Sequence, residues 1–267
     1  MGNEGLDKLL FELASESRLG ILRLLKVNDL RMQEIARRLD LTDTEACRQL
    51  QRLIDVELVE KQANATYRLT PYANLVLNTS TALEYIHKFK EYFLEHDAMF
   101  LPYEFVDRIG ELSTGEFSGD TLLTLNRVRQ MVYEAQEYIW VIAEQIDSSH
   151  IQVTNEKISE GLKLKFIMSR HFVQTTKFTP EMLLCPRCKK QIVLNENEFK
   201  KRGCGFCERR QLERICLSLF LNEKESCVIL RRIGDVMDFA AFFGTDEKFL
   251  KWARDAFMYY WEKAERW

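Results

Sequence analysis

The sequence predicts a mainly α-helical N-terminal region, a connecting helix and a C-terminal α/β domain. Apolar residues recur at helical spacing through residues 6–53, and two apolar runs flank a helical segment in the second half of the chain. With 267 residues, 46% of them hydrophobic and 30% charged, the chain has globular composition and room for about two domains. We predict domain boundaries at residues 1–72, 73–96 and 97–267.

Composition also limits the classes of function. Lys and Arg number 38 and Asp and Glu number 41, so the net charge of −3 is not that of a polycation. Residues 1–26 carry charges throughout and lack the apolar centre of a signal peptide. No stretch reaches the ~18 uncharged apolar residues of a membrane span. We therefore expect a cytoplasmic protein with no membrane contact.

A helix, a tight turn and a second helix are predicted over residues 31–56. Apolar side chains fall at i, i+3, i+4 and i+7 from Met32, and Ala46, Leu50 and Leu53 form the buried stripe of the second helix. Thr42 and Glu45 have the spacing of a capping box, which places the start of that helix at Thr42. The opposite face is expected to display Thr44, Glu45, Arg48, Gln49 and Arg52.

Residues 58–61 and 66–70 are predicted as two short strands joined by a four-residue turn. Helices followed by such a hairpin form a winged helix-turn-helix, whose second helix can lie in the major groove of DNA. Arg commonly reads guanine edges and Gln adenine edges, while the hairpin would face a neighbouring groove or phosphate. The predicted contacts to double-stranded DNA are Thr42, Thr44, Glu45, Arg48, Gln49, Arg52, Lys61, Asn64 and Arg68.

A winged helix that serves only protein interaction is the alternative. Residues 1–72 hold 11 basic and 12 acidic residues, which weighs mildly against nucleic acid because phosphate neutralisation supplies much of the affinity. The placement of the arginines on the helix-turn-helix favours DNA.

The connecting helix is predicted to carry a heptad seam. Its members are spaced 4, 3, 4, 3 and 4 residues apart, at Leu75, Thr79, Ala82, Ile86, Phe89 and Phe93. Such a seam can pair two copies into a homodimer, which would suit a palindromic DNA site. The alternative is that the stripe packs on the chain's own C-terminal domain. His87 and His96 are expected at the surface.

The C-terminal domain is predicted to contain a parallel strand–helix–strand unit, with strands at 138–142 and 162–168 around a helix at about 150–160. Further helices are expected at 102–112, 122–135 and 246–265, and further strands at 215–221 and 226–231. No GxSxG, P-loop or GxGxxG motif occurs, so no enzyme is predicted.

Four cysteines form a CxxC–x15–CxxC pattern, at Cys185, Cys188, Cys204 and Cys207. Two thiolate pairs held by tight turns can bind Zn²⁺ tetrahedrally, so we predict an inserted zinc ribbon at residues 183–210. The zinc could staple a small loop, sense metal or redox state, or support nucleic-acid contact through the nine basic residues that outnumber four acidic ones over 185–214. Cys47, Cys216 and Cys227 are expected to be inert core thiols.

Segments of both halves resemble known archaeal regulators. The stretches "LLFELASESRLGILRLL", "MQEIARRLDLTDTEACRQLQRLIDVELVEK" and "YRLTPYA" resemble winged-helix domains of archaeal ArsR-like regulators, over about residues 5–74. "RVRQMVYEAQEYIWVIAEQ", "GLKLKFIM" and the C-terminal helix resemble the middle domain of archaeal methanogenesis regulatory proteins, over about 92–184 and 212–267. Such domains remotely resemble the phospholipase D fold, but none of the four histidines here stands in an HxK motif.

The resemblance implies a DNA-binding transcription regulator. A small-molecule effector of unknown identity, or a metal or redox signal, would act on residues 97–267. The cysteine insertion is not part of the family pattern, so the resemblance implies nothing about its role. A zinc-ribbon adaptor that docks on the transcription machinery is the alternative function.

Overall fold

The computed structural model describes residues 5–144, 148–176, 184–190, 205–234 and 238–266. The chain divides into two compact units, Met1–Thr81 and Ala82–Trp267. The boundary lies in helix α5 (Pro71–Lys88), within the connecting helix that the sequence predicts for residues 73–96.

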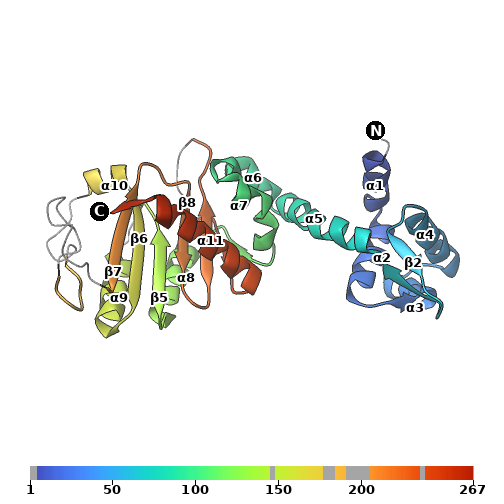
Figure 1. The fold of residues 1–267 in the computed structure, drawn as a ribbon, viewed down its shortest axis with the longest axis horizontal. Helices are drawn as coiled ribbons and strands as arrows, with labels where there is room; N and C mark the ends of the chain where they lie inside the picture. Colours follow the sequence, from blue (N-terminus) through green and yellow to red (C-terminus); the bar gives the residue numbers. More distant parts are fainter. Residues whose placement is uncertain (1–4, 145–147, 177–183, 191–204, 235–237, 267) are drawn as a thin grey trace. The chain divides into compact units, whose positions relative to one another are not determined.

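The first unit contains a helix-turn-helix and a β-hairpin (Figure 1). Its helices before α5 are α1 (Leu6–Leu13), α2 (Glu16–Val27), α3 (Met32–Leu39) and α4 (Asp43–Asp55). Its strands are β1 (Leu30–Arg31), β2 (Val59–Lys61) and β3 (Thr66–Leu69), in the antiparallel order β1-β3-β2. The sequence does not predict β1: Arg31, expected to be helical, pairs with Thr66 instead.

Local sequence signals set the end of α3 and the start of α4. Asp40 adopts a left-handed conformation (φ 54°), which ends α3. The Thr42 hydroxyl accepts a hydrogen bond from the backbone N–H of Glu45 at 3.2 Å, as the predicted helix start requires. Behind α4, Leu50 and Leu53 are 1% and 0% exposed and lie in the core of the unit. The predicted helix-turn-helix geometry is therefore present.

The predicted connecting helix is interrupted. Helix α5 and helix α6 (Lys90–Glu95) are separated at Phe89, whose dihedrals are not helical (φ −110°, ψ 35°). Ala82, Phe89 and Phe93 pack against the core of the second unit, whereas Leu75 is 67% exposed. The C-terminal part of the heptad seam therefore packs within the chain itself, and this part is not available to a second copy.

His96 is buried, so its predicted surface position is wrong. Its side chain is 3% exposed and stacks on the ring of Tyr92, with ring centroids 3.9 Å apart. Its Nε2 lies 3.0 Å from the carboxylate of Asp238, and its Nδ1 lies 2.9 Å from the backbone oxygen of Tyr92. The imidazole thereby joins α6 to a loop more than a hundred residues away. His87 is exposed, as expected.

The second unit is built on one mixed sheet. Its strands are β4 (Glu116–Ser118), β5 (Tyr138–Ile142), β6 (Lys163–Ser169), β7 (Cys207–Leu212), β8 (Leu217–Leu221), β9 (Ser226–Leu230), β10 (Ala241–Gly244) and β11 (Glu265–Arg266). Their order is β11-β7-β6-β5-β8-β9-β10-β4. Strands β5, β6 and β7 are mutually parallel and the remaining pairs are antiparallel.

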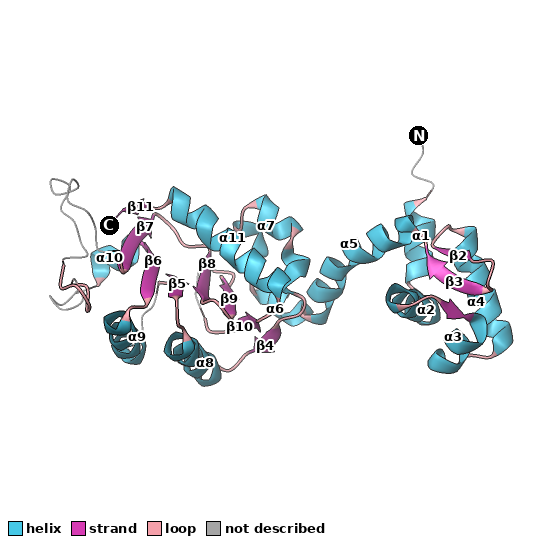
Figure 2. Ribbon diagram, turned by 60° about the horizontal axis from the view of Figure 1, so that its bottom comes forward, coloured by secondary structure: helices cyan, strands magenta, loops and turns pink. Residues whose placement is uncertain are grey.

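Helices cover both faces of this sheet (Figure 2). One face is covered by α8 (Thr121–Glu134) and α9 (Ser148–Glu160), the other mainly by α11 (Glu247–Lys263) with α6 and α7 (Tyr103–Asp107). The short helices η1 (Ala98–Phe100), η2 (Ile109–Leu112) and α10 (Arg170–Thr175) complete the described elements. The predicted parallel unit is confirmed, with α9 between β5 and β6.

The predicted cysteine-rich insertion is partly continuous with the sheet. Residues 191–204, and with them Cys204, lie outside the described residues. Cys207, however, begins β7, and the backbone N–H of Leu164 in β6 donates to the oxygen of Phe206 at 2.7 Å. The end of the predicted ribbon is thus a strand of the sheet, paired with β6 and β11, rather than a separate module.

Two further expectations concern exposure. Cys47 is exposed, in contrast to the expected core position, whereas Cys227 is buried and Cys216 half-buried. Over the part of the chain that the structure describes, no helix is both long and apolar enough to cross a membrane.

Candidate nucleic-acid interface

One face of α4 is open to solvent. A shallow depression on it is lined by Asp43, Thr44, Cys47, Arg48, Gln51 and Arg52. These positions recur every three or four residues, so they share the side of the helix opposite to Leu50 and Leu53. Two of the predicted contacts, Thr44 and Arg48, are exposed on this face. The face joins a long cationic arm to short polar side chains, which suits the edges of bases in a groove.

Gln49 does not lie on the open face. Its side chain is 8% exposed, and its Oε1 accepts a hydrogen bond from Arg18 Nη1 at 3.0 Å. Counted from Ala46, Gln49 is the i+3 member of the stripe whose i+4 and i+7 members are Leu50 and Leu53. The same count puts Gln51 on the outward side. Helical spacing alone could therefore have predicted that Gln51, and not Gln49, is exposed for contact with DNA.

Arg52 is half engaged with the protein. Its side chain is 43% exposed, yet its Nη2 lies 2.7 Å from Glu12 Oε1 and its Nε lies 3.2 Å from Glu12 Oε2. This fork-like pairing fixes the guanidinium at the edge of the depression. Arg52 is therefore placed to contact a phosphate more readily than to reach far into a groove.

Glu12 is the centre of a buried polar network that joins α1, α2 and α4. Its carboxylate also lies 2.7 Å from Arg18 Nε, and both side chains are less than a tenth exposed. Arg18 further donates to the backbone oxygens of Phe11 and Glu12, at 2.9 and 3.0 Å. The buried Glu12 carboxylate pairs with both arginines, and Arg18 also donates to Gln49 of α4. The network therefore orients α4 relative to α1 and α2.

The two arginines of this network have shifted pKa values. Burial lowers the pKa of the Arg18 guanidinium, the Glu12 carboxylate opposes that shift, and Arg52 adds to it. The hydrogen bonds that Arg52 donates to the Glu12 carboxylate raise the pKa of Arg52. Arginine starts so far above neutral pH that both groups stay cationic under ordinary conditions. The exposed ring of Phe11 lies 5.8 and 5.4 Å from the two guanidinium carbons.

The remaining predicted DNA contacts of α4 are Thr42 and Glu45, which lie at the start of the helix. Thr42 uses its hydroxyl to cap the helix, which leaves its side chain at the surface but committed to the backbone. Glu45 is half-buried. Arg52, on the same helix, pairs with Glu12, which α1 supplies.

Two of the three predicted DNA contacts on the hairpin are engaged with other groups of the hairpin. Arg68 is paired with Glu60 across the hairpin, and the Asn64 side chain accepts hydrogen bonds from the Thr66 backbone and hydroxyl at 3.1 and 2.7 Å. Lys61 is exposed and its ammonium lies 5.8 Å from the centre of the Tyr67 ring. Lys61 is therefore the cation of this hairpin that is best placed for a phosphate.

The described cysteines of the CxxC pattern lie in the second unit. The sulfurs of Cys185 and Cys207 are 3.6 Å apart and both side chains are buried. Two ligands about 2.3 Å from a tetrahedral Zn²⁺ would stand roughly 3.8 Å apart, so this spacing fits a shared metal. Over the described residues no cluster of three or more Cys, His, Asp or Glu side chains forms a metal site.

The loop that carries Cys185 is a tight turn docked on the sheet. The backbone N–H of Lys189 donates to Cys185 O at 2.9 Å, and that of Cys185 donates to Lys190 O at 2.8 Å. The Arg187 guanidinium lies 4.5 Å from the centre of the Phe206 ring and against Gly161, where a Cβ would be 2.2 Å from its Nη1. Gly161, with φ of +122°, thus both turns the chain and makes room for this arginine.

Comparison with known proteins gives distant likenesses. No family model and no curated protein matches the chain. A structure of TrmBL2, an archaeal chromatin protein described as showing a novel mode of DNA binding, is 17% identical, covers 98% of this chain and 99% of its own, and has a TM-score of 0.42. HlyU from Vibrio cholerae is 28% identical over 31% of this chain and 97% of its own, with a TM-score of 0.27. NucT from Helicobacter pylori is 10% identical over 57% and 97%, with a TM-score of 0.38. All three TM-scores are below 0.5, so we base the function on this chain's own residues.

Proposed function

We propose that the protein is a transcription regulator that binds double-stranded DNA through α4 of its winged helix-turn-helix. The observation that carries this proposal is the division of α4 into two faces. Leu50, Leu53 and Gln49 anchor the helix from behind, while Thr44 and Arg48 stand in the open depression on the other side. A helix with one anchored face and one open polar face is the element that such folds insert into a major groove.

The proposed contacts fall into two groups, those that can reach base edges and those that suit phosphates. Arg48 and Gln51 are exposed on α4 and can reach base edges, whereas Arg52 and Lys61 are suited to flanking phosphates. Arg37 and Arg38 in the last turn of α3 are also exposed and add positive charge beside the turn. Although residues 1–72 are nearly neutral overall, these cations are concentrated on the helix-turn-helix and the hairpin. The resemblance of residues 5–74 to archaeal ArsR-like regulators supports the same proposal.

Substitution of Arg48 tests this function. A duplex is first selected from a random library by repeated capture on the full-length protein, and its affinity is then measured by fluorescence anisotropy as a function of salt. Arg48→Ala is expected to weaken binding about 5-fold or more, because one arginine contact to a base is worth about 1–3 kcal/mol. Should Arg48 contact a phosphate instead, the salt slope falls by about 1.

Arg129→Ala is the matched control for that titration. Arg129 is an exposed arginine of α8 in the second unit, so its removal changes the net charge equally. It should leave both affinity and salt slope as they are. If Arg48→Ala also changes neither quantity, or if no duplex can be selected, the proposed DNA face is wrong.

We further propose that two copies associate through the exposed part of α5. Leu75 in the first unit and Leu83 in the second are 67% and 65% exposed, and Thr79 between them is exposed as well. Leu75 and Leu83 are eight residues, or about two helical turns, apart along α5, and such apolar side chains can pair with the same helix of a second copy. A dimer would match a DNA site made of two half-sites.

We also propose that the four cysteines hold one Zn²⁺ as a structural tie between the loop at 185–190 and strand β7. The 3.6 Å separation of Cys185 and Cys207 supports this assignment. Cys188, half-buried in the loop at 185–190, and Cys204 would supply the other two thiolates. The metal would hold a crossover that starts after β6 and returns as β7. The second unit would then serve as the regulatory part that receives a small-molecule effector.

A further inference from the structure

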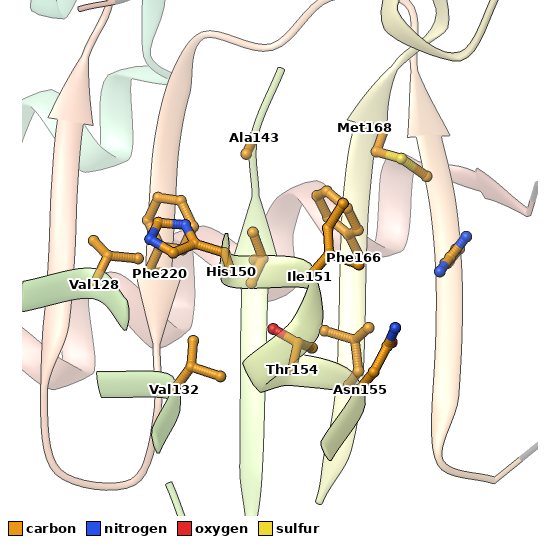
Figure 3. Close-up of a pocket in the computed structure, with 13 residues that line it drawn as sticks. Val128, Val132, Ala143, His150, Ile151, Thr154, Asn155, Phe166, Met168 and Phe220 are labelled. Carbon is orange, nitrogen blue, oxygen red and sulfur yellow. The ribbon is translucent and has the colours of Figure 1, made fainter. Parts of the chain in front are cut away.

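A cavity lies between the sheet of the second unit and the helices α8 and α9 (Figure 3). Its floor is one row of cross-strand neighbours: Phe220 in β8 faces Val141 in β5, Val141 faces Phe166 in β6, and Phe166 faces Arg209 in β7. Partners in register point to the same face of a sheet. The floor therefore runs from apolar side chains at β8 to a guanidinium at β7.

The two helices form the roof of this cavity. Val128 and Val132 of α8 line it from one side and are 2% and 3% exposed. Thr154 and Asn155 of α9 line it with a hydroxyl and an amide. Figure 3 shows these side chains together with Ile151 and Phe166 around the same space. The walls are thus apolar over most of their area, with a few polar groups on α9 and one cation on the sheet.

The size of the cavity limits its occupant. Its volume is about 90 Å³. Since one water needs roughly 10–15 Å³ of such space, the cavity has room for about six to nine water-sized groups. Adjacent strands are about 4.8 Å apart, so the row from Val141 to Arg209 spans about 10 Å. A planar ring or short branched chain with one polar end fits these dimensions.

We propose that this cavity binds a small carboxylate with an aromatic or branched aliphatic body. The carboxylate would pair with the Arg209 guanidinium, whose planar fork matches two carboxylate oxygens. The body would lie over Phe166 and Val141 beneath the valines of α8. The rest of the lining is mainly apolar, so burial of a second negative charge would be costly, which favours a monocarboxylate over a phosphate. As the effector site of the regulatory half, this assignment rests on the proposed function, whereas ligand binding itself does not.

Calorimetric titration of the full-length protein with benzoate tests the assignment. Benzamide, the neutral compound of the same shape, and inorganic phosphate serve as comparison ligands. Benzoate is expected to bind, benzamide to bind at least about 10-fold more weakly, and phosphate not to bind. A charge-assisted hydrogen bond is worth about 1.5–3 kcal/mol, which corresponds to this difference or a larger one.

Two variants locate the site. Arg209→Gln should lose the preference for benzoate over benzamide, while Arg210→Gln should keep it. Arg210 is the next residue of β7 and faces the opposite way, where its Nη1 donates to Trp261 O at 2.6 Å. Val132→Phe, which fills the cavity from α8, should abolish binding of both ligands, with circular dichroism to confirm that the variant is folded. Equal affinity for benzoate and benzamide, or unchanged benzoate binding in Arg209→Gln, would overturn the proposal.

The last comparison separates this proposal from the DNA proposal. The affinity for the selected duplex is measured with and without saturating benzoate, in the wild type and in Arg209→Gln. Benzoate binding in a protein that binds no DNA supports the cavity and refutes the proposed function. DNA binding in a protein that binds no benzoate supports the function and refutes the cavity. A shift of DNA affinity by benzoate in the wild type alone supports both.

Discussion

Two glutamines of α4 show how strongly one residue position decides a role. Gln49 is buried and accepts a hydrogen bond from Arg18, whereas Gln51 is exposed and donates to Asp55 at 2.8 Å within its own helix. Both have the side chain that commonly reads adenine, so residue type alone cannot distinguish them. Their positions relative to the buried stripe of α4 separate a structural glutamine from one that can face DNA.

The substitutions Gln49→Ala and Gln51→Ala should therefore affect different properties, the first stability and the second DNA affinity. Gln49→Ala removes the acceptor of a buried arginine and is expected to lower the free energy of unfolding of the first unit by about 1–3 kcal/mol. Gln51→Ala is expected to leave that stability within about 0.5 kcal/mol and to change DNA affinity instead. Hydrogen exchange of peptides covering residues 43–55 reports the stability, and anisotropy reports the affinity. If Gln49→Ala leaves exchange unchanged, the buried network is not holding α4.

Helices were predictable from the sequence where apolar residues recur at helical spacing over several turns. The α4 stripe and the N-cap at Thr42 follow from residue spacing alone. Strands β5 and β6 are also predictable because each is a largely apolar run, and the segment between them is long enough for the crossover helix α9. Strands β4, β10 and β11 are two to four residues long and carry no alternation, so their sequences hold no strand signal. The break at Phe89 was unpredictable because no Pro or Gly marks it.

Helix α5 carries the prediction on self-association. Leu75→Glu/Leu83→Glu places two carboxylates on its exposed apolar side and is expected to convert a dimer into a monomer. Sedimentation velocity measures the mass of the full-length protein. Leu122→Glu is the control, since Leu122 in α8 is 71% exposed and lies on another element. A wild-type monomer, or a double variant that stays dimeric, would contradict the proposed pairing.

The loop between β6 and β7 carries the prediction on zinc. Native mass spectrometry of a preparation made under reducing, non-chelating conditions should show one Zn²⁺ per chain, and Cys188→Ser should lose it. Removal of the metal by a chelator is expected to speed hydrogen exchange in residues 185–190 and 207–212, because metal binding contributes directly to local folding. Cys47→Ser, on an exposed thiol of the other unit, should retain the metal. A metal-free wild-type chain would refute the site.

The chain joins a helix-turn-helix unit to a sheet unit with its own cavity. The sequence indicated both parts and their order, since apolar residues recur at helical spacing in the first part and form strand-like runs in the second. It could not indicate the cavity, because Phe220, Val141, Phe166 and Arg209 are brought into one row by strand order and register. Side chains from β8, β5, β6 and β7 become neighbours only after folding. A site of this kind has no local motif.

The exposed thiol of Cys47 allows the most direct test of the DNA face, because it lies in the depression of α4 beside Arg48. The rate of its alkylation by a maleimide is measured by peptide mass spectrometry with and without saturating selected duplex, with half-buried Cys216 as the internal reference. A helix seated in a groove should slow alkylation of Cys47 by about 10-fold or more and leave Cys216 unchanged. An unchanged Cys47 rate at a DNA concentration that saturates binding would show that DNA lies elsewhere and would contradict the proposed role of α4.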